Sequence, residues 1–350
     1  MKPIDLIHMI APRAGSEHEA LHGFRLISDP IQHRRFNTGL YKMAELHHAR
    51  QVKGSGGGVL ITGPAGAGKT VLVSSYASRF QRESTLGSTK IPVLVVTVPS
   101  SPTAKSLGEA ILIALGYPKA YRGSGPQKTV LIHELFERCG VELLILDEFH
   151  HLFYAPTITH FRDVIDWLKN LISLTNIAVV ACGLPEAQSV VDANEQLARR
   201  FSTRFALSPF DGTTTEDFTE FRGILKLLQE YLPVPFETPI YEANMARRML
   251  IASHGLIDYV RKILEGAISV AANLGLKEVD LDVLAAGFRD RVWREVPDRL
   301  NPFHPESYLR SLDRSGEVFY LHTRHDPVGS ALARRQHPSR KSRFPMCALD

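Results

Sequence analysis

The chain has 350 residues, of which 44% are hydrophobic and 22% are charged, so its composition excludes a disordered or fibrous protein and indicates a buried core. The formal net charge of +4 is compatible with nucleic-acid binding and does not establish it. The three cysteines (Cys139, Cys182 and Cys347) lack metal-ligand spacing, and the chain does not open on a long apolar run. We therefore expect a reduced, cytoplasmic protein without a signal peptide or membrane span.

The first segment, residues 1–52, is expected to be a helical leader. Its first twenty residues show no clear pattern, whereas Leu40, Met43 and Leu46 follow helical spacing. The stretch KGSGGG at 53–58 then predicts a flexible joint before the first strand.

Residues 53–211 alternate between apolar, β-branched runs and helical patterns, which predicts a parallel sheet covered by helices on both faces. The expected fold class is therefore α/β with three layers. The expected strands are 58–62, 91–98, 141–148, 176–182 and 203–210. The expected helices are 69–82, 103–115, 126–139 and 160–173.

Residues 212–292 change to purely helical spacing and predict a small helical lid. The helical patterns lie around 221–232 and at 239–252, 256–273 and 280–290. Thr213 and Glu216 have the spacing of a capping box at the start of this region. Residues 293–350 contain prolines and a basic cluster between 334 and 343, and are expected to form an irregular or disordered tail.

The sequence GPAGAGKT at 63–70 fits the phosphate-binding P-loop pattern and lies between an apolar strand and a helix. Its glycines let backbone N–H groups turn inward around an anion, and the following helix presents its N-terminus to negative charge. The lysine is expected to reach the β- and γ-phosphates, and the threonine hydroxyl to ligate Mg²⁺. The residues predicted to hold ATP are Gly63, Pro64, Ala65, Gly66, Ala67, Gly68, Lys69, Thr70 and Val71.

The strand LLILDE at 143–148 supplies the second part of the predicted site. Asp147 is expected to hold Mg²⁺ together with Thr70, and Glu148 to polarise an attacking water. A glutamate in this place, together with a strand inserted between the two motifs, separates the ATPase class from kinases and GTPases. The order of strands in space does not follow from their order in the sequence.

Three arginines in LARRFSTRF lie where a helical pattern passes into the fifth strand, and in ring ATPases an arginine here reaches the neighbouring subunit's γ-phosphate. Arg200 and Arg204 are the main candidates for this arginine finger, and Arg199 is a weaker one. The alternative is that the three arginines form a solvated basic face. Arg261 is a weaker candidate for a lid arginine that contacts the nucleotide, because Asp258 occupies the usual position.

Two features allow a functional and a structural interpretation. Cys182 ends the fourth strand, where many such ATPases carry a polar sensor residue, and it is equally well explained as a small buried residue. The histidine pairs, His47–His48 and His150–His151, lack an acidic or cysteine partner with ligand spacing, so ordinary packing or solvation is expected for them.

The motifs GPAGAGKT, LLILDEFHH and IAVVACGLPEA, followed by RRF and preceded by the leader FRLISDPIQHRRF, resemble the TniB/TnsC group of transposition ATPases within the AAA+ class. The resemblance covers roughly residues 21–290. It implies ATP and Mg²⁺ as cofactors and assembly of the protein with itself into rings or helical filaments on double-stranded DNA. It also implies recruitment of a DDE transposase of the TniA/TnsB type, a TniQ-like targeting protein, and disassembly driven by hydrolysis.

If the resemblance holds, Lys119, Arg122 and Lys128 in YPKAYRGSGPQK are candidate DNA contacts, because their loop is rich in glycine and cations; a solvated loop is the alternative. Two other functions remain open. One is a helicase-loader-like or protein-remodelling ATPase, and the other is a nucleotide-dependent signalling switch that does not use DNA.

Overall fold

The structure is a computed structural model that describes residues 24–26, 30–54, 56–85 and 88–320. The chain forms two compact units. The sheet unit contains residues 39–62 and 73–206, and the helical unit contains residues up to 38, 63–72 and 207–320. The expected division at 52, 211 and 292 stays a prediction. The expected unpatterned start, Cys347 and the basic cluster at 334–343 lie outside the described residues.

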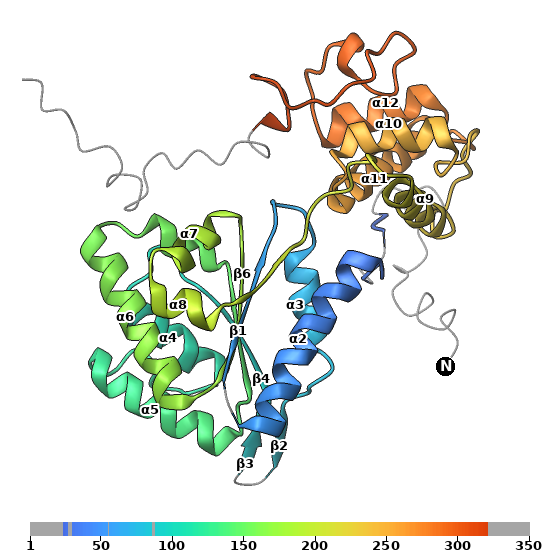
Figure 1. Cartoon of the computed structure of the whole chain (residues 1–350). Coiled ribbons are helices and arrows are strands. Elements are labelled where there is room, and N and C mark those ends of the chain that lie inside the picture. The colour runs from blue at the N-terminus through green and yellow to red at the C-terminus, as the bar shows by residue number, and fades with distance from the viewer. Residues whose placement is uncertain (1–23, 27–29, 55, 86–87, 321–350) are drawn as a thin grey trace, which may run out of the picture. The chain divides into compact units, whose positions relative to one another are not determined.

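A parallel sheet of five strands forms the centre of the sheet unit and confirms the expected α/β class (Figure 1). In spatial order the strands are β4 (Val93–Thr97), β5 (Leu143–Asp147), β6 (Ala178–Gly183), β1 (Gly58–Thr62) and β7 (Thr203–Ala206). Their register aligns the carboxyl ends, with Thr97 opposite Asp147 and Ile61 opposite Cys182. The last residues of β5, β6 and β1 therefore lie at one edge of the sheet.

Helices cover both faces of this sheet, as Figure 1 shows. On one face lie α4 (Ala104–Ala114), α5 (Gly125–Cys139) and α6 (Ile158–Thr175), and on the other α2 (Arg34–Lys53) and α3 (Lys69–Ala77). The predicted apolar stripe of α6 is buried against the strands, with Val164 and Leu168 fully inaccessible. Burial of both faces explains why the strands are continuous apolar runs.

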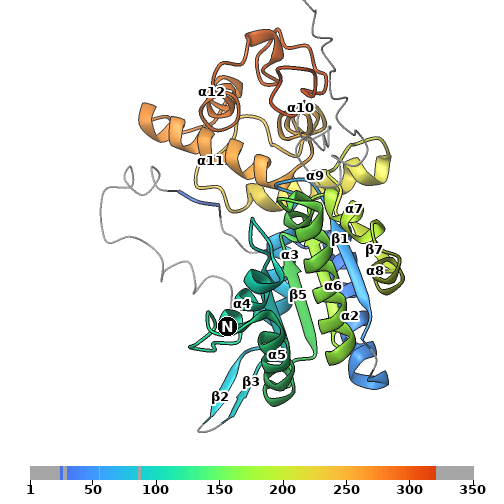
Figure 2. The same cartoon turned by 90° about the vertical axis from the view of Figure 1, so that its left-hand side faces the viewer.

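Several short elements were not predicted from the sequence. The strands β2 (Glu83–Thr85) and β3 (Ser88–Lys90) form an antiparallel hairpin that lies beside α5 in Figures 1 and 2. A 3₁₀ helix, η3 (Phe149–Tyr154), follows β5, and α7 (Glu186–Asp192) and α8 (Glu195–Arg200) follow β6. The hairpin strands are polar and short, so they carry no alternating apolar pattern.

The helical unit contains α9 (Thr215–Gln229), α10 (Ala243–Ser253), α11 (Ile257–Leu274), α12 (Leu281–Arg291) and the 3₁₀ turn η4 (Asp298–Leu300). Helices α11 and α12 approach closely at two glycines, since a Cβ on Gly287 would lie 2.5 Å from the Ala267 amide nitrogen. Of the described residues, none belongs to a helix long and apolar enough to cross a membrane.

One expectation for this unit was wrong. The cap of α9 is Thr214, whose side chain accepts from the Asp217 amide; Thr213 instead donates to the Asp211 carboxylate, so the box with Glu216 does not form. Residues 293–320 are irregular, as expected, but they are packed rather than disordered. Phe303 and Phe319 in this segment are fully buried in the core of the unit.

Candidate nucleotide-binding site

The P-loop connects β1 directly to α3, as its sequence predicts. Gly66 and Gly68 adopt positive φ angles of 79° and 90°, which side chains other than glycine rarely tolerate. Gly63 is required for another reason, because a Cβ there would lie 2.6 Å from the Leu207 carbonyl oxygen. The loop thus has the backbone shape that a phosphate cradle requires.

Lys69 is the first residue of α3 and is 8% exposed. Its ammonium donates to the carbonyl oxygens of Gly63 and Pro64, both at 2.8 Å. These bonds hold the amino group over the loop's own backbone, at the helix N-terminus. The side chain of the next residue, Thr70, is exposed, as is that of Val71.

Asp147 and Glu148 lie at the carboxyl end of β5 with different surroundings. Asp147 is 6% exposed, and its Oδ1 accepts from the Glu148 amide at 2.9 Å. Glu148 has a left-handed backbone with φ of 56°, so the chain turns sharply after the aspartate. Its carboxylate is 37% exposed and therefore remains accessible to solvent.

The strand between the two motifs is β6, which lies between β1 and β5. Along the sequence, the strand at 91–98 lies between the two motifs, and its place in the sheet was left open; it corresponds to β4, which lies at the edge of the sheet. Cys182 and Gly183 end β6 and are fully buried. Burial fits the structural interpretation of Cys182, whose role as a sensor stays a prediction.

The three candidate finger arginines each have a partner within the chain. Arg199 pairs with Glu195 at 2.6 Å, Arg204 pairs with Asp192 at 2.6 Å, and Arg200 donates to the Ser173 hydroxyl at 2.9 Å. Arg199 and Arg204 are exposed and Arg200 is half-buried. Their role toward a neighbouring subunit stays a prediction.

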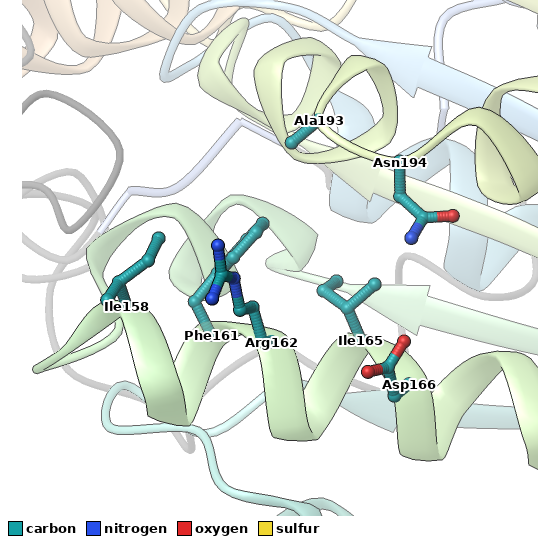
Figure 3. A pocket seen from close by; sticks show the side chains of 7 residues that line it. All are labelled: Ile158, Phe161, Arg162, Ile165, Asp166, Ala193 and Asn194. Carbon is teal, nitrogen blue, oxygen red and sulfur yellow. The ribbon is translucent and has the colours of Figure 1, made fainter. Parts of the chain in front are cut away.

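A hollow of about 300 Å³ lies between α6 and the α7–α8 connection (Figure 3). Ile158, Phe161 and Ile165 line it from α6, and Asn194 lies across from them. Asn194 also caps α8, the helix that ends at Arg200. Helix α6 thus lines the hollow and also carries Ser173, the hydrogen-bond partner of Arg200.

Arg261 lies on α11 of the helical unit and contacts the leader. Its Nη2 donates to the Leu26 carbonyl oxygen at 3.0 Å, and the Leu26 amide donates to Glu265 at 2.9 Å. The carbonyl and the amide of Leu26 are therefore bound by Arg261 and Glu265, which lie one helical turn apart on α11. The predicted contact between Arg261 and a nucleotide stays a prediction.

Of the candidate DNA contacts, Lys119 and Arg122 are exposed, as the hypothesis requires. The expectation for Lys128 was wrong, since it is only 1% exposed. Its ammonium donates to the carbonyl oxygens of Ala120 and Arg122 and lies 3.5 Å from a Glu109 carboxylate oxygen. Lys128 therefore stabilises the loop from inside and presents no charge to solvent.

The argument that the second histidine pair lacks an acidic partner was also wrong. Glu148 Oε2 lies 3.4 Å from His150 Nδ1, because the left-handed turn at Glu148 brings the carboxylate back over η3. The sequence carries no pattern that predicts this cluster, because neither a regular strand nor a regular helix places Glu148, His150 and His151 all on one face.

Together, the parallel sheet, the glycine loop after β1 and the acidic pair after β5 define a P-loop protein of the AAA+ class. A model of the bacterial TniB protein family matches residues 27–211, more than half of the chain, and the chain belongs to that family. Comparison with curated proteins gave no significant match.

Several solved structures have a similar fold. ORC2 of Aeropyrum pernix in ADPNP–ADP complexes has 16% identity over 77% of this chain and 70% of that chain, with a TM-score of 0.57. ORC1 of Aeropyrum pernix in complex with DNA has 19% identity over 76% and 68%, with a TM-score of 0.56. Cdc6p from Pyrobaculum aerophilum has 14% identity over 81% and 73%, with a TM-score of 0.57. At these identities the likeness concerns the fold.

Proposed function

We propose that this chain is an ATP-dependent regulator of DNA transposition that hydrolyses ATP slowly. The observation that carries the proposal is a shaped P-loop that follows β1, together with Asp147 and Glu148 at the carboxyl end of β5 in the same sheet, in a chain of the TniB family. Membership of the family favours transposition, and the site favours a nucleoside triphosphate as the ligand.

Each side chain of the site has a defined part in the proposal. Lys69 and the loop amides bind the phosphates, and Thr70 and Asp147 hold the Mg²⁺ that neutralises phosphate charge. Glu148 orients the attacking water and accepts its proton, and its exposed carboxylate fits that part. Buried Asp147, in contrast, is fixed by the Glu148 amide and suits a static ligand.

Assembly is the second component of the proposal. Arg200 or Arg204 completes the site of the next protomer, so that bound ATP stabilises rings or filaments on double-stranded DNA. Exposed Lys119 and Arg122 provide phosphate contacts without base preference. The assembled form then recruits a DDE transposase of the TniA/TnsB type and receives target information from a TniQ-like protein, and hydrolysis disassembles it.

The decisive experiment is electron microscopy and DNA binding with a non-hydrolysable ATP analogue, using wild type and Lys69→Ala. Wild type should assemble on random duplex DNA at low salt, and the variant should lose nucleotide binding and assembly together. Assembly by Lys69→Ala would refute the coupling of ATP to DNA.

Two outcomes would favour the alternative functions. Dependence on single-stranded DNA or on a helicase would indicate a loader-like or remodelling ATPase. Hydrolysis that no form of DNA stimulates, in a protein that stays monomeric, would indicate a signalling switch.

The contribution of the loop to DNA binding has its own test. Each lost phosphate contact should lower the slope of log K against log salt by about 0.9, so replacing Lys119 and Arg122 by alanine should lower it by about 2 per protomer. Lys277→Ala, which removes an exposed cation of the helical unit, is the control and should leave the slope unchanged. An unchanged slope in the double variant would exclude this loop as a DNA contact.

A further inference from the structure

Glu148, His150 and His151 form a compact cluster of potential metal ligands next to the end of β5. One ligand atom from each residue lies within 4.8 Å of the other two. The set combines two imidazoles and one carboxylate, which is a donor set found in zinc sites. Mg²⁺ prefers oxygen donors instead, so this cluster favours Zn²⁺ over Mg²⁺.

His151 has the orientation of a histidine prepared to bind a metal. Its Nδ1 lies 2.8 Å from the Val98 carbonyl oxygen, so that nitrogen carries the proton and donates. The lone pair of the ring is consequently on Nε2. Histidine ligands of metals commonly show this arrangement, in which a backbone carbonyl fixes the tautomer and the ring plane.

His150 is held in place by its surroundings. Its Nδ1 lies 3.4 Å from the Leu184 amide nitrogen and 3.4 Å from Glu148 Oε2. The side chain is 7% exposed, and its backbone packs on β6, where a Cβ on Gly183 would lie 2.9 Å from the His150 amide nitrogen. The ring therefore has little freedom, whereas the more exposed Glu148 side chain has room to close on a cation.

We propose that Glu148, His150 and His151 bind a zinc ion that regulates the site. Tetrahedral Zn²⁺ with bonds of about 2.1 Å places its ligands about 3.4 Å apart, so the cluster needs to contract by about 1 Å. Glu148 Oε2 and His150 Nδ1 already lie 3.4 Å apart, so the contraction falls on the distances to His151 and needs small rotations of the side chains. Water occupies the fourth position.

Zinc would affect hydrolysis because Glu148 is both a zinc ligand and the group that accepts the proton of the attacking water, a role that rests on the proposed function. A Glu148 carboxylate bound to Zn²⁺ has its basic lone pairs engaged, so it no longer accepts a proton from water. Zn²⁺ therefore inhibits hydrolysis while leaving the phosphate-binding loop intact. The bound state is an ATP-holding form, which would prolong assembly.

Binding is tested on the full chain without nucleotide or Mg²⁺, by titrating Zn²⁺ in competition with a chromogenic chelator. Wild type should bind one Zn²⁺ at this site, and His151→Gln and Glu148→Gln should each weaken it by about tenfold or more. His160→Gln, which removes an exposed histidine outside the cluster, should bind as wild type does. Co²⁺ should give tetrahedral absorption bands in wild type and lose them in His151→Gln.

If wild type and His151→Gln bind Zn²⁺ with equal affinity, and circular dichroism shows that both are folded, the proposed zinc site is wrong. The regulatory part is measured as the ratio of ATPase rates with and without micromolar Zn²⁺ at constant Mg²⁺. The ratio should fall in wild type and His160→Gln and stay near one in His151→Gln. Zinc binding without a change in that ratio would overturn the regulation. Zinc binding to a protein that hydrolyses no ATP would refute the proposed function and leave the metal site standing.

Discussion

Lys128 provides a direct test of how burial decides the role of a cation. The sequence places it in a basic, glycine-rich loop, but the structure gives its ammonium the carbonyl oxygens of Ala120 and Arg122 as acceptors. Replacing Lys128 by methionine keeps most of the side-chain volume and removes the charge. We expect this variant to lose stability in the sheet unit rather than a DNA contact.

The loss of stability in Lys128→Met can be estimated from the hydrogen bonds that the ammonium group makes. Two hydrogen bonds from a charged, buried donor are worth about 1.5–3 kcal/mol each, or about 3–6 kcal/mol together. The methionine avoids the desolvation of an ammonium and adds apolar burial, which returns on the order of 1–2 kcal/mol. The free energy of unfolding should therefore fall by about 1–5 kcal/mol.

The chain offers a local probe for this measurement. Trp167 donates to the Thr129 hydroxyl at 2.8 Å and lies in the sheet unit, whereas Trp293 lies in the helical unit. Urea unfolding followed by tryptophan fluorescence in a Trp293→Phe background therefore reports the sheet unit alone. Lys119→Met, at an exposed position, is the matched control and should change stability by less than about 0.5 kcal/mol. A Lys128→Met variant that unfolds at the same urea concentration and slope as wild type would refute the reasoning.

Three further predictions concern titration and catalysis. Burial lowers the pKa of His33 to about 4, with Glu220 raising it and Arg35 lowering it by smaller amounts, from the ordinary value of 6.5. The folded state then binds fewer protons than the unfolded state, so stability is present above pH 6.5 and lost as the pH falls toward 4. Urea unfolding should show a loss of about 2 kcal/mol between pH 7 and pH 5, and His33→Gln should remove most of that dependence. Glu148→Gln should lower the hydrolysis rate by about a hundredfold or more and give long-lived assemblies on DNA; assemblies as short-lived as those of wild type would contradict its role. Arg200→Ala should keep nucleotide binding by monomers, measured by fluorescent-nucleotide titration, and lose DNA-stimulated hydrolysis; if hydrolysis persists, the same loss is expected of Arg204→Ala.

The sheet could be predicted because its signals are local. A strand buried on both faces must be apolar at every position, and each expected strand overlaps an observed one, with β1 matching at both ends. The P-loop was equally readable, since positive φ angles at Gly66 and Gly68 require glycine whatever the tertiary context. These features depend on residues adjacent in the chain.

What the sequence did not reveal depends on distant contacts. The strands β2 and β3 are polar in sequence and β2 is exposed throughout, so no hydrophobic pattern marks the hairpin. The order of β6 and β4 follows from the path of the connecting helices rather than from the strands themselves. The contact of Glu148 with His150 depends on one left-handed residue, which is uncommon for glutamate and has no signature in composition.

The comparison of Lys69 with Lys128 shows why position in the fold, rather than local bonding, identifies a nucleotide-binding lysine. Both lie in the first turn of a helix, and both donate to two carbonyl oxygens of the preceding loop. Hydrogen bonding alone would assign them the same role. The two lysines differ in their place in the fold. Lys69 lies in the helix that follows β1, in the sheet whose strand β5 ends at Asp147. Lys128 is enclosed by α4, α5 and their connecting loop. A cation can bind a phosphate only where the surrounding chain leaves space for it, so the neighbours of a lysine must be known before its charge is assigned to a ligand.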